Sequence, residues 1–376
     1  MSLRAGQSLA ADPRQAVEGL YLAIAQPDMA LVVFFCSSRF DLGVLAVAIN
    51  ERFAGTPVIG CTTAGEIGPA GYRDGSLVGV SFSSASCVAA VGRIDRLAQC
   101  NTADAFAVAQ ALRQQVAGST THSFALLLID GLCGREEPLA HALQSGLGDI
   151  PMVGGSAGDD QLFIATRVFA DGAFRDDAAV LAVLKTELPF KVFRGHHFVG
   201  GTEPLVVTEA DAHHRIVYEI NGRPAATEYA RAAGIGSEAL TSAHFAATPM
   251  VVRINGNDYV RSIRQVNTDG SLTLYCAIDR GVVLRVARGL DLVQSRRALF
   301  DELRQRIGPP QLILGFDCIH CNAQARGEDG RHAIEQVFGD NRVLGFSSYG
   351  EQFMGLHVNQ TFTGVAIGRA EGVNGA

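Results

Sequence analysis

The chain has 376 residues, 48% of them hydrophobic and 18% charged, so it is long enough for more than one packed core and too apolar to be disordered. Its formal net charge of -7, without any block of Lys and Arg, argues against nucleic acid or membrane lipid as the main partner. The opening MSLRAGQSLAADPRQ has no apolar signal core, and no window approaches the roughly 18 apolar residues of a membrane span, so we expect a cytoplasmic protein without membrane insertion.

The first predicted elements form a strand–helix–strand–turn–strand unit that follows a helix expected over residues 13–26. The apolar run ALVVFFCSS (30–38) is typical of a strand buried on both faces. FDLGVLAVAINERF (40–53) has the apolar spacing of a helix. VIGCTTAGEI (58–67) predicts a strand that ends in a turn, and GSLVGVSFS (75–83) predicts another strand.

The same order of elements recurs twice along the chain. Gly60 follows Val33 by 27 residues, as Gly154 follows Leu127, while 33 residues separate Leu312 from Gly345. The third copy therefore carries an insertion, which we place around residues 322–330, and helices are expected before the second and third copies at 103–116 and 291–307. These copies predict an internal duplication that places the three glycines at equivalent turns. The fold class expected is α/β, a two-domain layered architecture with mixed sheets and duplicated strand–helix–strand units.

The middle of the chain follows a different pattern. Residues 187–200 and 205–220 are predicted to be strands, the latter a hairpin that turns at 210–213. NGRPAATEYARAAG predicts a helix, with Asn221 as a cap and Arg223–Pro224 in its first turn. A strand-rich stretch follows from 250 to 286, broken at Asn255-Gly256 and at Asp269-Gly270. We place the domain boundary near Asn221.

Several of these motifs resemble a known family. FFCSSRFDL, VIGCTTAGEI and GSLVGVSF are similar to the start of a FIST N domain; EINGRPAATEYARAAG, LGFDC, VLGFSSYGEQF and LHVNQTFTGVAI are similar to a FIST C domain. The resemblance covers about residues 25–370 and implies a sensory input module of bacterial signal transduction. It implies an N-terminal segment and first helix at 1–27, a FIST N-like domain at 28–220, a FIST C-like domain at 221–370 and a flexible tail at 371–376.

The stretch containing HHF, LVVTEAD and EINGRPAA further resembles the NosP branch of this family. That resemblance implies b-type haem as cofactor, nitric oxide as the ligand sensed, and a sensor histidine kinase or a cyclic-di-GMP synthase or phosphodiesterase as partner. The chain could also form a homodimer. The segment DCIHCNAQARG departs from the pattern of the branch.

A histidine pair, His196-His197, supplies the candidate haem ligands. On a continuous strand, neighbouring residues point to opposite faces, and the face with Phe193, His197 and Val199 carries no charge. An imidazole in an apolar pocket suits axial ligation of haem iron. The residues alone favour an ordinary core or surface histidine. Together with the resemblance, the apolar face makes His197 the expected ligand, with His196 as second choice.

A second candidate site is a ligand cleft at the strand ends. Duplicated units often meet across a pseudo-symmetric seam where ligands bind, so we expect Cys36, Arg39, Glu66 and Glu351 to lie close together. In the alternative interpretation, the Gly-Glu turns only shape the backbone and the glutamates bond to backbone amides.

The third candidate is Cys318-Ile319-His320-Cys321, which could bind zinc through Cys318 and Cys321, act as a redox pair, or be ordinary reduced thiols. Nothing in the sequence sets a Cys–His or Ser–His pair at a recognised spacing, and no nucleotide-binding glycine motif follows a strand, so no catalytic residue is assigned. Three functions stay open: a haem-based nitric oxide sensor, a FIST-type sensor of another small ligand such as an amino acid, and a hydrolase or transferase using the strand-end cleft.

Overall fold

The computed structural model describes residues 2–116, 122–236, 240–254, 256–325 and 328–369. The chain divides into two compact units: unit 1 comprises Met1–Gly195, Arg296–Leu356 and Phe362–Ala376, and unit 2 comprises His196–Ser295 and His357–Thr361. Asn221, the boundary expected from the sequence, lies inside unit 2, and the tail expected at 371–376 lies outside the described residues. Among the helices that the structure describes, none is long and apolar enough to cross a membrane.

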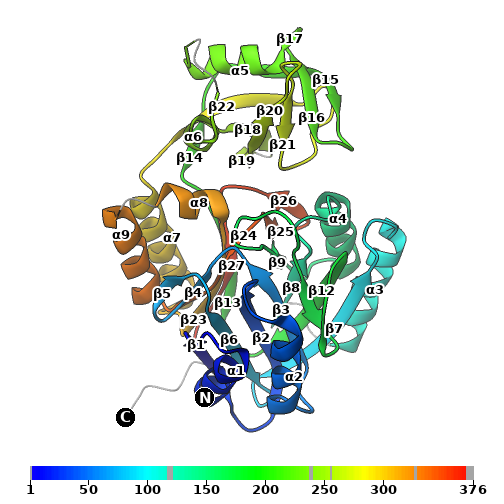
Figure 1. Ribbon diagram of the computed structural model, residues 1–376, viewed down its shortest axis with the longest axis vertical. Helices are drawn as coiled ribbons and strands as arrows, with labels where there is room; N and C mark the ends of the chain where they lie inside the picture. Colours follow the sequence, from blue (N-terminus) through cyan, green and yellow to red (C-terminus); the bar gives the residue numbers. More distant parts are fainter. Residues whose placement is uncertain (1, 117–121, 237–239, 255, 326–327, 370–376) are drawn as a thin grey trace. The chain divides into compact units, whose positions relative to one another are not determined.

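Unit 1 contains three copies of one motif: strand, helix, strand, helix, strand, hairpin, strand (Figure 1). The first copy comprises β1 (Leu3–Ser8), α1 (Pro13–Ile24), β2 (Met29–Ser37), α2 (Leu42–Arg52), β3 (Val58–Thr63), β4 (Glu66–Gly68), β5 (Gly71–Arg73) and β6 (Leu77–Ser83). The second comprises β7 (Cys87–Asp95), α3 (Thr102–Gln115), β8 (Ser123–Ile129), α4 (Glu136–Leu147), β9 (Met152–Ser156), β10 (Val168–Ala170), β11 (Ala173–Arg175) and β12 (Ala178–Thr186). The third comprises β13 (Phe190–Gly195), α7 (Leu292–Ile307), β23 (Leu312–Cys318), α8 (Ile319–Gln324), α9 (Glu328–Asp340), β24 (Val343–Ser348), β25 (Glu351–Phe353), β26 (Leu356–Val358) and β27 (Phe362–Ile367). The duplication and the α/β class expected from the sequence are confirmed, and residues 196–291 of unit 2 are inserted between β13 and α7 of the third copy.

The three copies exchange their hairpins. The sheets have the orders β1-β6-β2-β3-β10-β11, β7-β12-β8-β9-β25-β26 and β13-β27-β23-β24-β4-β5. Each sheet therefore pairs four strands of its own copy with a hairpin from another copy. The backbone repeats the same contact at each exchange: Thr62, Ser156 and Ser347 donate their N–H groups to the carbonyl oxygens of Arg167, Gly350 and Gly65, at 2.8–2.9 Å. This exchange brings strand ends of all three copies together.

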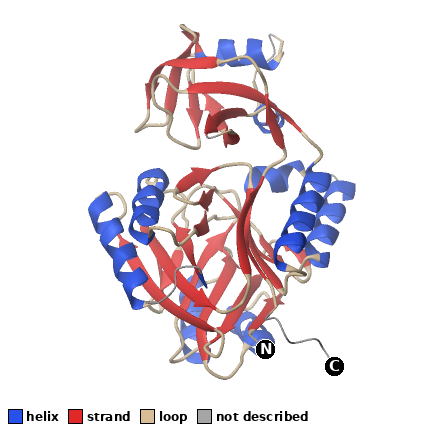
Figure 2. Cartoon of the chain, turned by 180° about the vertical axis from the view of Figure 1, so that it is seen from behind, coloured by secondary structure: helices blue, strands red, loops and turns tan. Residues whose placement is uncertain are grey.

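One core lies between the three sheets, and helices cover their outer faces (Figure 2). On β2, Leu31, Val33 and Phe35 point into this central core, while the alternate residues Val32 and Phe34 pack under α1 and α2. The strand is thus buried on both faces, as its continuous apolar run predicts. Asp12, Asp41 and Asn101 cap α1, α2 and α3, each accepting backbone N–H groups of the first turn.

Gly60, Gly154 and Gly345 occupy equivalent positions, which confirms the symmetry predicted for them. They lie inside β3, β9 and β24, however, and the expectation of turns was wrong. A Cβ atom on these residues would stand 2.6, 1.9 and 1.7 Å from the carbonyl oxygen of the partner residue on the neighbouring parallel strand. The glycines are therefore needed for close approach of two backbones rather than for chain reversal.

The described residues of unit 2 form a nine-stranded sheet with two helices. Its elements are β14 (Phe198–Gly200), β15 (Leu205–Asp211), β16 (Ile216–Ile220), β17 (Arg223–Pro224), α5 (Ala225–Ala233), α6 (Ser242–Ala247), β18 (Met250–Ile254), β19 (Asn257–Arg261), β20 (Ile263–Val266), β21 (Leu272–Leu274) and β22 (Val283–Gly289). The expected hairpin joins β15 and β16, but its turn lies at 212–215 rather than at 210–213. Asp269-Gly270 turns between β20 and β21, while Asn255 lies outside the described residues. The expected cap was wrong, because α5 begins at Ala225 after Pro224 and Asn221 has a left-handed backbone with φ 53°.

Candidate functional site

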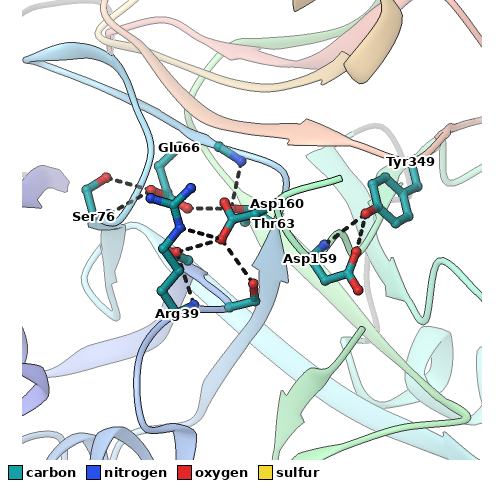
Figure 3. Close-up of polar contacts among 10 residues, drawn as sticks. Arg39, Thr63, Glu66, Ser76, Asp159, Asp160 and Tyr349 are labelled. Carbon is teal, nitrogen blue, oxygen red and sulfur yellow. Dashed lines mark hydrogen bonds and ion pairs between the residues drawn. The ribbon is translucent and has the colours of Figure 1, made fainter. Parts of the chain in front are cut away.

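The strand ends of the first copy carry a buried carboxyl group, that of Glu66 (Figure 3). Glu66 begins β4, the hairpin strand that pairs with β24 of the third copy. The Thr63 hydroxyl donates to Glu66 Oε1, and the backbone N–H and hydroxyl of Ser76 donate to Oε2 at 2.9 and 2.8 Å. Burial raises the pKa of Glu66 to about 7, although these hydrogen bonds oppose the shift. Near neutral pH the group can therefore hold or release a proton.

A second carboxylate, Asp160, lies beside the end of β2. Its Oδ2 accepts hydrogen bonds from the hydroxyls of Ser37 and Ser38 and from Arg39 Nε, each at 3.1 Å (Figure 3). The Asp160 side chain is 7% exposed and that of Arg39 62% exposed. Asp160 also contributes to raising the pKa of Glu66, after the larger effect of burial. The cluster thus extends from the buried Glu66 to the solvent-exposed Arg39.

The loop that carries Asp160 has a strained backbone. Asp160, Gln161 and Phe163 have φ values of 56°, 71° and 54°, and such left-handed residues cost on the order of 1–3 kcal/mol each. Asp159 fixes the loop: its carboxylate accepts the N–H groups of Phe163 and Ile164 at 2.8 and 2.7 Å. The half-exposed ion pair of Asp160 with Arg39 contributes about 0–1 kcal/mol by comparison, so it does not offset this strain.

Tyr349, from the third copy, holds the same loop from the other side. Its hydroxyl donates to Asp159 (Figure 3). Its ring stacks on that of Phe163 with a centroid separation of 4.4 Å. Tyr349 also packs with Ala64 of the first copy, Cys318 and Cys321. Residues of all three copies therefore meet next to the Asp160 loop.

Of the four residues grouped from the sequence as a ligand cleft, the structure brings three together. The Cys36 thiol interacts electrostatically with Glu66 and Asp160. Burial raises the pKa of this thiol, and the negative charges of the two carboxylates raise it further. Arg39 joins them through Asp160. Glu351 lies at the equivalent place in the third copy, where Ser348 Oγ donates to it at 2.7 Å, just as Thr63 donates to Glu66. The raised thiol pKa of Cys36 makes it a weak nucleophile.

The Cys318-x-x-Cys321 segment begins helix α8, with both thiols buried. Burial raises the pKa of Cys321 well above its usual value and lowers that of His320 to about 4. Among the described residues, no group of three or more His, Cys, Asp and Glu is placed to hold a metal ion. The zinc interpretation of Cys318 and Cys321 stays a prediction.

A buried ion pair lies next to Cys321. Arg296 of α7 donates to Asp317 of β23 at 2.9 Å, and both side chains are buried. Tyr72 of β5 donates its hydroxyl to the same carboxylate, and the Arg296 guanidinium lies 5.0 Å from the centre of the Phe362 ring. This network joins three elements of one sheet to the helix that covers it.

The two candidate haem ligands lie in unit 2, between β13 and β14. The strand predicted through His196 and His197 is interrupted there, because β13 ends at Gly195. His197 is 2% exposed, and its ring packs on that of Phe198 with a centroid separation of 4.1 Å. Its carbonyl oxygen accepts the N–H of Leu290 at 2.7 Å. His196 is half-buried and its interaction with Asp258 adds to the larger effect of Arg253 in lowering that carboxyl's pKa.

A cavity of about 350 Å³ lies in unit 2 on the strand that follows His197. Its lining runs over Val199, Gly200 and Gly201, and it includes Ala287 and Arg288 of β22 but neither histidine. The volume is at the lower end of ligand cavities, about 300–1,000 Å³. A neutral imidazole beside apolar side chains, as in His197, is the kind of ligand that haem iron takes, and Arg288 can pair with a propionate, whereas the cavity lining also contains Glu203.

Several residues of the unit 1 cluster were not singled out from the sequence as members of a site: Thr63, Ser76, Tyr349, Arg296 and Asp317. The available signal was the alignment of the copies, because Thr63–Glu66 and Ser348–Glu351 have the same spacing of a hydroxyl and a carboxyl residue. Comparing the copies position by position predicts both pairs.

Comparisons with known families agree with the repeated motifs. The family model of the FIST N domain matches residues 30–223, and that of the FIST C domain matches residues 225–354. No curated protein matches the chain.

Proposed function

We propose, from the premise that the chain belongs to the family of proteins with FIST N and FIST C domains, that it is a haem-based nitric oxide sensor. FIST domains are sensor domains of signal transduction. The partner proposed is a sensor histidine kinase or an enzyme that makes or degrades cyclic-di-GMP, in the cytoplasm. The observation that carries the proposal is the buried His197 beside an apolar cluster in unit 2.

His197 would hold the iron, because a neutral imidazole among apolar residues competes for iron better than a hydrated one. Bound haem would supply an iron centre that takes nitric oxide as an axial ligand. Phe198 and Val199 would supply apolar contacts, and Arg288 an ion pair at the cavity edge. His196 is the second choice, since it is only half-buried.

The test is a titration of the full-length protein with haemin, followed by its Soret band before and after reduction and addition of nitric oxide. We expect a ligated band that shifts with nitric oxide and that is lost in His197→Ala. His213→Ala and His214→Ala are matched controls, because both residues are exposed in the β15–β16 turn. Binding that is unchanged without His196 and His197, or no binding at all, would refute the haem proposal.

A second candidate is a FIST-type sensor of another small ligand, such as an amino acid, bound by unit 1. The observation that favours it is the cluster of Glu66, Asp160 and Arg39, which offers a carboxyl group that can be neutral, a carboxylate and an exposed guanidinium. Haemin binding and the thermal stability of the protein with added small ligands separate the two candidates, because the residues concerned belong to different units.

A further inference from the structure

The three copies of unit 1 are alike where they build the fold and differ where β2, β8 and β23 end. The equivalent segments, counted from the partners of the three repeated glycines, are Ser37–Arg39, Asp130–Leu132 and Cys318–His320. In the second, the Asp130 carboxylate accepts hydrogen bonds from its own copy, from the Thr166 hydroxyl and the N–H groups of Leu132 and Asp177. In the third, the Cys318 thiol is buried, and burial lowers the pKa of His320 to about 4. Only in the first does a charged side chain, Arg39, extend into solvent from this position.

The second copy also departs from the other two, and it does so toward Arg39. In the first and third copies, the hairpin begins at Glu66 and Glu351, three residues after the end of β3 and β24. In the second copy, the longer loop 157–167 separates β9 from the hairpin, which begins at Val168. The N–H of Thr62 donates to the carbonyl oxygen of Arg167 in this loop, and Asp160 accepts a hydrogen bond from Arg39. The loop therefore brings a carboxylate to the exposed Arg39 at the end of β2.

The hydrogen bond between Arg39 and Asp160 fixes the orientation of the Arg39 guanidinium. Asp160 accepts this bond from Nε, at 3.1 Å. Within the part of the chain that the structure describes, Nη1 and Nη2 of Arg39 make no hydrogen bond. The free edge of a guanidinium donates two parallel N–H groups, which match the two oxygens of a carboxylate or phosphate. Asp160 is itself held by the hydroxyls of Ser37 and Ser38, so the guanidinium is oriented before a ligand arrives.

We propose that Arg39, positioned by Asp160, binds a small oxyanion, a carboxylate or a phosphate, at the end of β2. This inference rests on the second candidate function, whose site it assigns to a ligand class. Arg39 makes the contact, and Asp160 is a positioning residue that acts through it. The strained backbone of the loop is consistent with this role, since strained residues cluster at ligand sites.

The experiment is isothermal titration of the full-length protein with sodium succinate and, separately, with inorganic phosphate, at constant ionic strength set by NaCl. We expect saturable binding of at least one of the two, and the stronger of the two identifies the class. Arg39→Ala should abolish it, and Arg39→Lys should weaken it about tenfold, because an ammonium cannot form the two parallel bonds. The matched control is Arg14→Ala, which removes an exposed arginine that pairs with Glu51 elsewhere on unit 1.

The variant Asp160→Asn distinguishes the positioning of Arg39 by Asp160 from the electrostatic effect of the Asp160 charge. Removal of a negative charge alone would strengthen the binding of an anion, whereas loss of positioning weakens it. We expect a loss of about fivefold to tenfold, roughly what one net hydrogen bond contributes. Tighter binding by Asp160→Asn would refute the positioning role. Equal binding by Arg39→Ala and the wild type, or binding of neither anion by the wild type, would overturn the proposal. Haemin uptake by the same variants shows independently whether the haem proposal stands.

Discussion

The ionisation of Glu66 should make the stability of unit 1 depend on pH in a way that the variant Glu66→Gln removes. Burial raises the pKa of this carboxyl from 4.5 to about 7 in the folded chain. A group whose pKa is raised by folding binds its proton more tightly in the folded state, so its contribution is fully present below pH 4.5 and is lost as the pH rises through 7. The shift of about 2.5 pKa units corresponds to about 3 kcal/mol, at 1.36 kcal/mol for each unit.

The assay is urea unfolding, followed by circular dichroism because the chain has no Trp, at intervals from pH 4.5 to 8. The difference in free energy of unfolding between the wild type and Glu66→Gln should fall by about 3 kcal/mol across this range. Taking the difference cancels the groups that titrate equally in both proteins. Gln mimics the protonated acid in size, and its amide can donate to the hydroxyl of Thr63 or Ser76.

Glu228→Gln is the matched control. A hydrogen bond from Arg231 lowers the pKa of Glu228 to about 2, so this group completes its titration below the pH range of the assay. The wild type and Glu228→Gln should therefore have a constant difference from pH 5 to 8. If the wild type and Glu66→Gln give parallel profiles, within about 1 kcal/mol, then Glu66 is not perturbed by burial and the reasoning fails.

Two further predictions concern the fold that supports the site. Gly154→Ala should destabilise the protein by at least about 3 kcal/mol, because the new Cβ would stand 1.9 Å from the Leu127 carbonyl oxygen. Gly339→Ala, in α9 with open space around it, should be neutral or stabilise by about 1 kcal/mol, and similar unfolding free energies for the two variants would contradict the close approach. Arg296→Met should cost about 3–5 kcal/mol because it leaves the Asp317 carboxylate buried without its cation. The double variant Arg296→Met with Asp317→Asn should recover much of that loss in the same urea assay, and no recovery would show that Arg296 acts through packing instead.

The duplication could be predicted from the sequence because it depends on local patterns. Continuous apolar runs such as LVVFF and ALLLI predict strands with two covered faces, and glycines at matched spacing predict equivalent positions in each copy. The hairpin exchange could not be predicted this way. Strands β4 and β5 have three residues each, too few for a periodic signal, and their partners lie in another copy.

Some residues of the candidate site could be predicted from the sequence, but the contacts that join them could not. Cys36, Arg39 and Glu66 were grouped from their places at strand ends, but the residue that joins them, Asp160, lies 121 residues from Arg39 along the chain. The alternation used for the histidine pair assumed one continuous strand, and this assumption failed at Gly195. His197 is buried because of its contact with Phe198 in unit 2 and not because of its position on a strand face.

The place at which unit 2 is inserted matters for any signal that begins at His197. This residue follows the last residue of β13 by two positions, and its carbonyl accepts the N–H of Leu290, which precedes α7 by two positions. The segments that leave and re-enter the third copy are therefore joined to each other within unit 2, by this hydrogen bond and by the pairing of β14 with β22. A ligand that displaces His197 would act on both segments, and α7 carries Arg296 of the buried ion pair with Asp317. A ligand can shift such an equilibrium only by binding two arrangements with different affinity. Amide exchange along α7, recorded during the haemin titration, would test whether displacement of His197 is transmitted in this way, and unchanged exchange would exclude this route.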